Sequence, residues 1–458
     1  YPSPSKDYLL AFEVKITFKT AIKKIIKIYY IDAISGNKIS SFDAMPHTSI
    51  IGKGQSNFYG NVDIVMDSIS PNLFLLHDSL RNITVYSESS GAVYSNDTKE
   101  WTFESEGDKS AVDVMYGTGK FYDLMLEKFG LKGIDNQSGP LNAGVNIALF
   151  NNAYWDGEAT HFGSGDCYIF YPFTAIDVVG HEFAHGLTEF HSNLIYSHES
   201  GAMNEAMSDI IGKSLEKIYH PESFSWGIGG FFSKIRKDFR NMDDPNLTNN
   251  PKYYKGLYWW DDFWDNYGVH TNSGVLNHWF YLLTEGGSGV NEGDILYNVQ
   301  GIGIDKALDI AVNLNLNYLS ENSTYFDAYK LSLEVVKDLF PNDVIVMDAV
   351  IEAWKAVGID ENRLLEGNDK ELVLNTYIFD NRAEWAINVC NEELQDLDIE
   401  FRNESNITIP KETNMYVEFV FEYNVNDNGI FKIIRDTIKN EQKLLTDFSK
   451  DSSIFFHV

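Results

Sequence analysis

Apolar and polar residues alternate near the start of the chain, over residues 8–18 and 25–31, and a turn-forming stretch follows at residues 32–38. Alternation with a period of two residues is typical of half-buried strands. Residues 49–110 continue in a strand-like pattern that Gly, Asn, Asp and Ser often interrupt. We therefore predict that the first hundred residues are rich in β-structure, with hairpins within residues 1–48.

The apolar spacing becomes helical near residue 110. It predicts helices over residues 111–129, 173–190, 200–218, 274–283, 301–319, 325–339 and 343–357. Strand-like runs return at residues 371–379 and 416–423, after a polar stretch at residues 360–370. We interpret residues 371–458 as an appended β-rich domain, for which a sandwich is one candidate fold, and residues 360–370 as its linker.

The composition limits the class of partner. The chain has 458 residues, 44% of them hydrophobic, and a net charge of −31. A surface this acidic repels nucleic acid and anionic membranes, so we expect neither as a partner. No run of 18 apolar residues occurs, so we expect no membrane insertion. The two cysteines, Cys167 and Cys390, exclude a disulfide framework, and their pairing stays open.

A metal-binding pattern lies inside the helix predicted at residues 173–190. His181 and His185 are four residues apart, so their side chains share one helix face and can bind one Zn²⁺. Glu182 lies beside them, where a general base of a zinc hydrolase is needed. Two surface histidines on a helix are the alternative interpretation.

The next predicted helix offers further ligands. Catalytic zinc takes three protein ligands and keeps one open position. Glu205 can be the third ligand, and Asp209, one turn further, can accept the free ring N–H of a liganding histidine. Acidic residues also favour the start of a helix, so these two carboxylates alone leave both interpretations open.

These motifs closely resemble the thermolysin family of neutral metallopeptidases, a gluzincin family. The resemblance covers residues 50–359 and includes the segments at residues 151–157, 178–189, 199–209, 268–274, 301–306 and 353–359. It implies an α+β fold of two lobes: a β-rich N-terminal lobe over residues 49–190, which includes the zinc helix, and a helical C-terminal lobe over residues 191–359. It also implies one catalytic zinc ion bound by His181, His185 and Glu205.

Other roles follow from the resemblance. Glu182 is implied as the general base, Tyr196 and His270 as donors to the oxyanion, and Asp265 as the acid that orients His270. The substrate backbone is implied to contact Asn152, Ala153 and Arg240. A pocket for a large hydrophobic residue after the cut is implied to be lined by Phe170, Phe173, Val178 and Phe239. Ordinary packing is the alternative for the aromatic residues.

The calcium pattern of the family is incomplete in this chain. Asp177 and Glu216 match two carboxylates of a double calcium site beside the zinc helices, but the stretch after Glu216 lacks the remaining acids. Calcium needs six to eight oxygen ligands. We therefore expect one weakened calcium site or none.

Residues 6–48 resemble the C-terminal half of the family's propeptide, a PepSY-like module. We expect residues 1–48 to be a propeptide remnant, with the mature enzyme starting near residues 46–52 of an uncleaved zymogen. The resemblance implies a secreted zinc endopeptidase with polypeptide substrates, and we expect a monomer. The alternatives are a non-catalytic binding or adhesion protein on a peptidase scaffold, and a chain whose biological role lies in residues 371–458, for which we assign no family.

Overall fold

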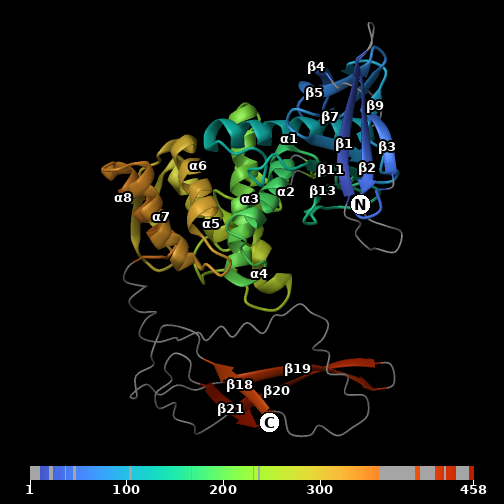
Figure 1. Ribbon diagram of the computed structural model, residues 1–458. Helices are drawn as coiled ribbons and strands as arrows, with labels where there is room; N and C mark the ends of the chain where they lie inside the picture. Colours follow the sequence, from blue (N-terminus) through green and yellow to red (C-terminus); the bar gives the residue numbers. More distant parts are fainter. Residues whose placement is uncertain are drawn as a thin grey trace. The chain divides into compact units, whose positions relative to one another are not determined.

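The protein is described from a computed structural model (Figure 1). The described residues are 11–19, 24–36, 38–44, 48–102, 106–166, 168–230, 232–235, 238–360, 398–402, 418–427, 430–439 and 453–457. Cys167 and Cys390 therefore lie outside the described residues. Clustering of the backbone divides the chain into two units, Tyr1–Leu372 and Val373–Val458.

The first unit contains a β-rich lobe. Its strands are β4 (Thr48–Gln55), β5 (Asn61–Ser70), β6 (Leu73–Leu75), β7 (His77–Asp78), β8 (Ile83–Ser87), β9 (Ser95–Asn96), β10 (Glu100–Trp101), β11 (Leu141–Ile147), β12 (Ala153–Trp155) and β13 (Ala159–Gly163). One sheet has the order β10-β4-β5-β6-β9, and β4 and β5 pair antiparallel along their whole length. The other has the order β12-β13-β11-β8-β7, in which β8, β11 and β13 are parallel. Both sheets fall in the region for which the sequence predicts a β-rich lobe.

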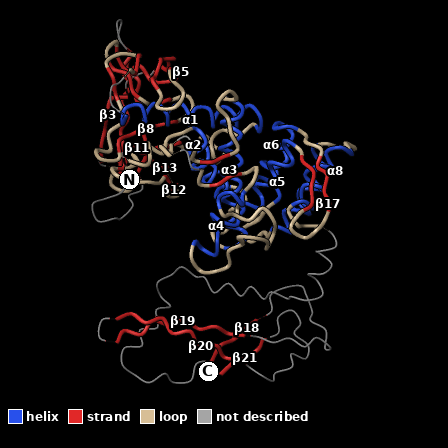
Figure 2. The backbone as a smooth tube through the Cα atoms, turned by 180° about the vertical axis from the view of Figure 1, so that it is seen from behind, coloured by secondary structure: helices blue, strands red, loops and turns tan. Residues whose placement is uncertain are grey.

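Helices form most of the rest of this unit. Most of them lie to one side of the two sheets, whereas the first helix runs along the strands (Figure 2). They are α1 (Glu106–Phe129), α2 (Ile176–Phe190), α3 (His198–Tyr219), α4 (Asp265–Asn272), α5 (Gly274–Glu285), α6 (Gly303–Asn313), α7 (Tyr325–Leu339) and α8 (Val344–Ala356). A 3₁₀ turn, η1 (Pro245–Thr248), and a π-helical turn, η2 (Leu314–Tyr318), complete them. The predicted helices are confirmed, although α1 begins five residues earlier than expected and the helix expected at residues 301–319 changes to π geometry in its last part.

Three features of the helical lobe were not predicted. A hairpin of β16 (Gly287–Val290) and β17 (Leu296–Val299) follows α5, because Gly286 adopts a φ of 83° and ends that helix. Helix α4 lies where no helix was expected. Its first four residues have positive φ, so it is not a regular right-handed helix and has no regular apolar spacing. A short pair of strands, β14 (Gly227–Ile228) and β15 (Arg240–Asn241), lies between α3 and η1.

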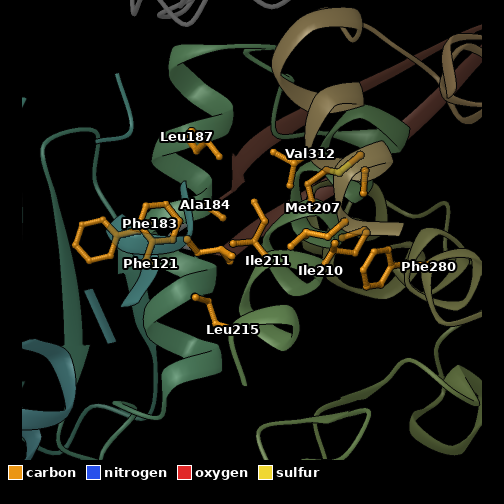
Figure 3. Packing of buried hydrophobic residues seen from close by; sticks show 14 of the residues in the cluster. Phe121, Phe183, Ala184, Leu187, Met207, Ile210, Ile211, Leu215, Phe280 and Val312 are labelled. Atoms are coloured by element: carbon orange, nitrogen blue, oxygen red, sulfur yellow. The ribbon is translucent and has the colours of Figure 1, made fainter. Parts of the chain in front are cut away.

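The core is built around α2 and α3. Apolar side chains of α1 and α2 meet those of α3, α5 and α6, as Figure 3 shows for Phe121, Phe183, Ala184, Leu187, Met207, Ile210, Ile211, Leu215, Phe280 and Val312. Each of these side chains is almost fully buried, and burial of one large apolar side chain stabilises a fold by about 1.5–3 kcal/mol. The two central helices are thus held from both sides.

Glycines let α2 and α3 approach each other closely. A Cβ atom at Gly212 would lie 2.2 Å from the carbonyl oxygen of Asp177, and one at Gly180 would lie 2.4 Å from Leu215 Cδ1. No other residue type leaves this space free. The close approach brings the polar face of α3 next to the histidines of α2.

The remaining described strands form small separate sheets. In the N-terminal segment β1 (Ala11–Lys19), β2 (Lys24–Asp32) and β3 (Lys38–Ala44) form an antiparallel sheet, as the alternating pattern predicts. In the second unit β18 (Asp398–Arg402) pairs with β21 (Ser453–His457), and β19 (Glu418–Asp427) pairs with β20 (Ile430–Lys439). The strand expected at residues 371–379 lies outside the described residues. Within the described residues, no helix has both the length and the hydropathy that a membrane crossing needs.

Candidate metal centre and substrate cleft

Helix α2 presents three polar side chains on the floor of a cleft of about 1030 Å³. His181 and His185 are one turn apart, and their rings meet edge to face with centroids 4.6 Å apart. Glu182 lies between them along the helix and lines the same cleft, with only 6% of its surface exposed. The other face of α2 is buried in the core, so the helix cannot turn these side chains away.

Three possible metal ligands converge at this point. Nε2 of His181 and Nε2 of His185 are 3.0 Å apart, and they lie 3.5 and 3.4 Å from the two carboxylate oxygens of Glu205. All three ligand atoms lie within 4.8 Å of one another. Among the described residues, this is the only group of histidine, cysteine or acidic side chains with such an arrangement.

The outer ring nitrogens of the two histidines have polar neighbours on α3. Nδ1 of His181 lies 2.9 Å from Asp209 Oδ1, and Nδ1 of His185 lies 2.7 Å from Asn204 Oδ1. In the neutral ring of His185 an acceptor at Nδ1 favours the tautomer with the proton on that nitrogen, which leaves the Nε2 lone pair facing the centre. For His181 the carboxylate of Asp209 lies within ion-pair distance of Nδ1.

The residues fit a zinc ion. Two imidazoles and one carboxylate leave a fourth position open, and Glu205 Oε2 is buried without a hydrogen-bond donor among the described residues. Burial alone would lower the pKa of His185, but the carboxylate of Glu205 outweighs burial and raises it to about 9. The buried carboxylate that attracts a proton to His185 would attract a metal cation in the same way, and the cation would displace that proton from the ring.

The carboxyl group of Glu182 is placed to bind a proton. Burial raises the pKa of Glu182 above its ordinary value, and the imidazoles of His181 and His185 oppose this shift. A carboxylate with a raised pKa is a stronger proton acceptor near neutral pH.

Tyr196 and His270 also approach the carboxylate of Glu205. The Tyr196 hydroxyl donates to Glu205 Oε1 and lies 3.1 Å from His270 Nε2, which is itself 3.4 Å from Glu205 Oε1. His270 Nδ1 pairs with Asp265 Oδ1, while its backbone N–H donates to Asp265 Oδ2 over 3.0 Å. Burial would lower the pKa of His270, but Glu205 and then Asp265 outweigh it and raise the pKa, so the charged form of this donor is favoured.

A left-handed turn at the start of α4 brings Asp265 under His270. Asp265, Asn266, Tyr267 and Gly268 have φ values of 60°, 48°, 66° and 84°. Left-handed backbone costs about 1–2 kcal/mol per residue other than glycine. The ring of Tyr267 stacks on His198 with centroids 3.9 Å apart, and this contact holds the strained turn against the start of α3.

Arg240 reaches the site from β15. Its Nε and Nη2 donate to the two oxygens of Asp209 over 2.7 Å each, and Nη2 lies 3.7 Å from Glu205 Oε2. Asn277 adds a 2.8 Å bond to Asp209 Oδ2. Burial would raise the pKa of Asp209, but Arg240 and His181 outweigh it and lower the pKa to about 2. Asp209 therefore stays ionised between a metal ligand and a cleft residue.

Most residues predicted to contact substrate line the cleft, including Asn152, Ala153, Phe173, Val178, Phe239 and Arg240. Phe170 does not; its ring packs 5.6 Å from Phe173 and 5.5 Å from Phe239, so it supports the pocket from behind. Ile228 and Phe232 line the cleft but were not predicted.

The two carboxylates predicted for calcium do not face an open cation position. The ammonium group of Lys213 lies between them, paired with Glu216 and 3.7 Å from Asp177 Oδ2. This geometry does not fit a calcium ion at the same place.

Sequence reasoning missed Asn204, Asn277 and Lys213. A signal for Asn204 existed, because Asn204 and Ser208 repeat at the same four-residue interval as Glu205 and Asp209, and Ser208 Oγ lies 3.2 Å from His185 Nδ1. No local pattern marks Asn277 or Lys213, since their contacts depend on tertiary packing.

Two family models match the chain. The model described as "Thermolysin metallopeptidase, catalytic domain" matches residues 51–189, and the model described as "Thermolysin metallopeptidase, alpha-helical domain" matches residues 192–359. Together these ranges cover more than half of the chain.

Curated proteins and solved structures are also similar. Bacillolysin from Bacillus cereus is 30% identical over 371 residues, which cover 72% of this chain and 64% of that protein. Thermolysin from Bacillus sp. (strain EA1) is 32% identical over 379 residues, which cover 76% of this chain and 66% of that protein. The chain thus spans just under two thirds of the length of these two relatives. The solved precursor of protealysin, a metalloproteinase from Serratia proteamaculans, is 28% identical with a TM-score of 0.49 and covers 60% of this chain and 87% of that chain.

Proposed function

Because the chain belongs to the thermolysin family of metallopeptidases, we propose that it is a zinc-dependent endopeptidase that hydrolyses internal bonds of polypeptides. One observation carries this proposal: the ligand atoms of His181, His185 and Glu205 converge on the floor of an open cleft. The side chains of Glu182, Tyr196 and His270 lie around the same ligands, and these proton donors and acceptors support hydrolysis over storage of a metal.

The proposed mechanism starts with the proton on the attacking water. A zinc ion in the site would polarise the scissile carbonyl and lower the pKa of a bound water to about 7. Glu182 takes the proton of the attacking water, since its raised pKa matches this task. The same carboxyl group then delivers the proton to the leaving amine, and so returns to its starting state.

Tyr196 and His270 supply donors for the developing oxyanion. Both side chains are aimed at the oxygen of Glu205 that faces the metal position, so they can reach an oxygen placed beside it. The pairing of His270 with Asp265 keeps its ring oriented and charged. Removal of one such donor typically lowers kcat by about 10²–10³-fold.

The substrate backbone is proposed to lie along the cleft between Asn152, Ala153 and Arg240. Two nitrogens of Arg240 are used by Asp209, and Nη1 is the nitrogen left to donate to a peptide carbonyl. Phe173, Val178 and Phe239 form an apolar wall, which favours a large hydrophobic residue just after the scissile bond.

We further propose that residues 1–48 are a propeptide remnant, that residues 371–458 form an appended β-domain, and that the enzyme is secreted. The antiparallel sheet β1–β3 and the strand pairs β18–β21 and β19–β20 are compatible with the first two proposals. Secretion is supported by the family resemblance.

The experiment compares the chain with Glu182→Gln in cleavage of casein and in zinc content. We expect about one zinc per chain in both proteins, because Glu182 is not a ligand, and loss of cleavage only in the variant. Glu334→Gln, an exposed α7 residue paired with Lys337, is the matched control and should cleave like the unmutated chain. Zinc binding without cleavage, even after removal of residues 1–48, would favour the binding-protein alternative.

Peptide substrates test the specificity. Peptides that differ only in the residue after the scissile bond should be cleaved with kcat/KM higher for Leu or Phe than for Gly or Asp. Equal rates for all four would contradict the assignment of the apolar wall.

A further inference from the structure

The side chain of Lys213 is a buried positive charge that the proposed catalysis does not use. It lies in the middle of α3 with 0% of its surface exposed. Lysine is almost never fully buried unless paired, because removing an ammonium group from water is costly. The surroundings of Lys213 must therefore replace its hydration shell.

Its surroundings supply oxygen atoms from three elements. Nζ donates to the Gly227 carbonyl of β14 over 2.8 Å, pairs with Glu216 on α3, and lies 3.7 Å from Asp177 Oδ2 on α2. The ring of Phe224 closes the site, with its centroid 5.2 Å from Nζ. An ammonium group has three protons to donate and no acceptor. These partners can thus satisfy it without water.

The same oxygens are of the kind that calcium binds. Calcium requires six to eight oxygens, several of them from carboxylates. Asp177 Oδ2 and Glu216 Oε1 are buried and accept no hydrogen bond from the described residues. Lys213 Nζ lies 3.7 Å from Asp177 Oδ2 and pairs with the other oxygen of Glu216, so it is the cation next to both carboxyl groups. Within those residues, neither carboxylate belongs to a group of three side chains arranged for a metal.

The charge in this region also disfavours a divalent ion. Burial, and next the charge of Asp177, raise the pKa of Glu216 to about 8, although Lys213 opposes the shift. A carboxyl group with a raised pKa holds a proton more readily than an ordinary glutamate does, and this weakens Glu216 as a calcium ligand. Burial raises the pKa of Asp238 nearby, and Lys213 opposes that shift as well, so this ammonium group acts on all three acidic side chains.

We propose that the Lys213 ammonium is the resident cation of this position in place of a divalent metal, and that it makes the pairing of α2 and α3 independent of calcium. Asp177 is four residues before the zinc-motif histidine His181, and Glu216 is eleven residues after Glu205. Lys213 thus ties the two helices together close to the metal centre. The inference concerns stability and holds whether or not the chain cleaves peptides.

The first test measures the unfolding temperature of the full chain with Glu182→Gln, which prevents self-cleavage. Bound calcium raises the unfolding temperature of any protein that binds it only when folded. With one equivalent of zinc supplied and ionic strength matched with NaCl, we expect no shift on addition of millimolar CaCl₂. Elemental analysis after dialysis should find zinc and no calcium. A calcium-dependent rise of several degrees, or one retained calcium per chain, would overturn the proposal.

The second test removes the charge. Lys213→Met keeps the length of the side chain but leaves two buried carboxylates facing each other, so we expect an unfolding temperature lower by several degrees. Lys213→Ser opens space at the same place, and calcium should then restore part of the loss. Lys217→Met is the matched control on the same helix, since Lys217 is partly exposed and pairs with Glu285; it should show neither effect. A Lys213→Met chain as stable as the unmutated one contradicts the proposal. If neither Lys213 variant folds, the effect of calcium on the unfolding temperature of the unmutated chain decides whether the proposal holds.

Discussion

The carboxylate of Asp209 joins the metal centre to the substrate cleft, and asparagine at this position tests that connection. Asp209 accepts two bonds from Arg240 and one from Asn277, and it lies 2.9 Å from Nδ1 of His181. Asparagine has the same shape but only one acceptor oxygen and no charge. In Asp209→Asn an NH₂ group must therefore face either the guanidinium or the imidazole N–H.

Two losses follow from this change. Removing one partner of a buried ion pair costs about 3–5 kcal/mol, and because Arg240 keeps Glu205 at 3.7 Å we expect about 3 kcal/mol. A loss of that size lowers the unfolding temperature by roughly 5–10 °C. The neighbour of a liganding histidine also contributes to metal binding, so zinc affinity should fall by about 10- to 100-fold.

Calorimetry of the zinc-free and zinc-loaded proteins measures the first loss, and competition with a chelator measures the second. Asn277→Ala is the control, because it removes only a neutral donor from Asp209; it should cost about 1 kcal/mol and leave zinc affinity unchanged. If Asp209→Asn binds zinc as tightly as the unmutated chain and unfolds at the same temperature, the carboxylate does not connect the two sites.

Three further predictions concern the structure around the site. Tyr267→Gly removes the ring stacked on His198 and puts glycine, which adopts left-handed backbone without strain, at this position. We expect kcat to fall severalfold. The unfolding temperature should change little, because relief of about 1 kcal/mol of strain offsets the lost ring contact. Burial lowers the pKa of His278 to about 4, below the unfolded value of about 6.5. As the pH falls from about 6.5 to about 4, the folded state therefore loses about 3 kcal/mol relative to the unfolded state. His278→Asn should flatten that part of the acid-unfolding curve. In Gly212→Ala the new methyl group would meet the carbonyl oxygen of Asp177 at 2.2 Å, so calorimetry should show a lower unfolding temperature and the purified protein should retain less zinc.

Regular periodicity made the helices and the first metal ligands predictable. The expected helix at residues 325–339 coincides with α7, whose start is fixed by a capping box between Thr324 and Asp327. The interval between His181 and His185 predicts a shared helix face, and the structure places both ligand nitrogens on that face. In these cases neighbours along the chain determine the geometry.

Tertiary contacts made other features unpredictable. Lys213 belongs to a polar stretch that suits a solvated helix face, and only the approach of α2 and β14 shows that it is buried. Tyr267 is a poor choice for left-handed backbone, and its conformation depends on the stacked ring of His198. The convergence of Glu205 on the two histidines likewise needed the family resemblance, because no local pattern brings α3 next to α2.

The close packing of α2 against α3 connects the zinc site with the buried Lys213. The helices approach closely because Gly180 and Gly212 lack side chains, and this approach buries most of the polar side chains between them. A buried polar face must satisfy its own charges, since unpaired charges are costly there. Near the cleft a metal ion would balance Glu205, whereas about two turns further along α3 Lys213 already balances two acidic side chains. The zinc site can therefore be emptied and filled while the lysine keeps the helices paired, so metal removal should abolish activity before it unfolds the chain.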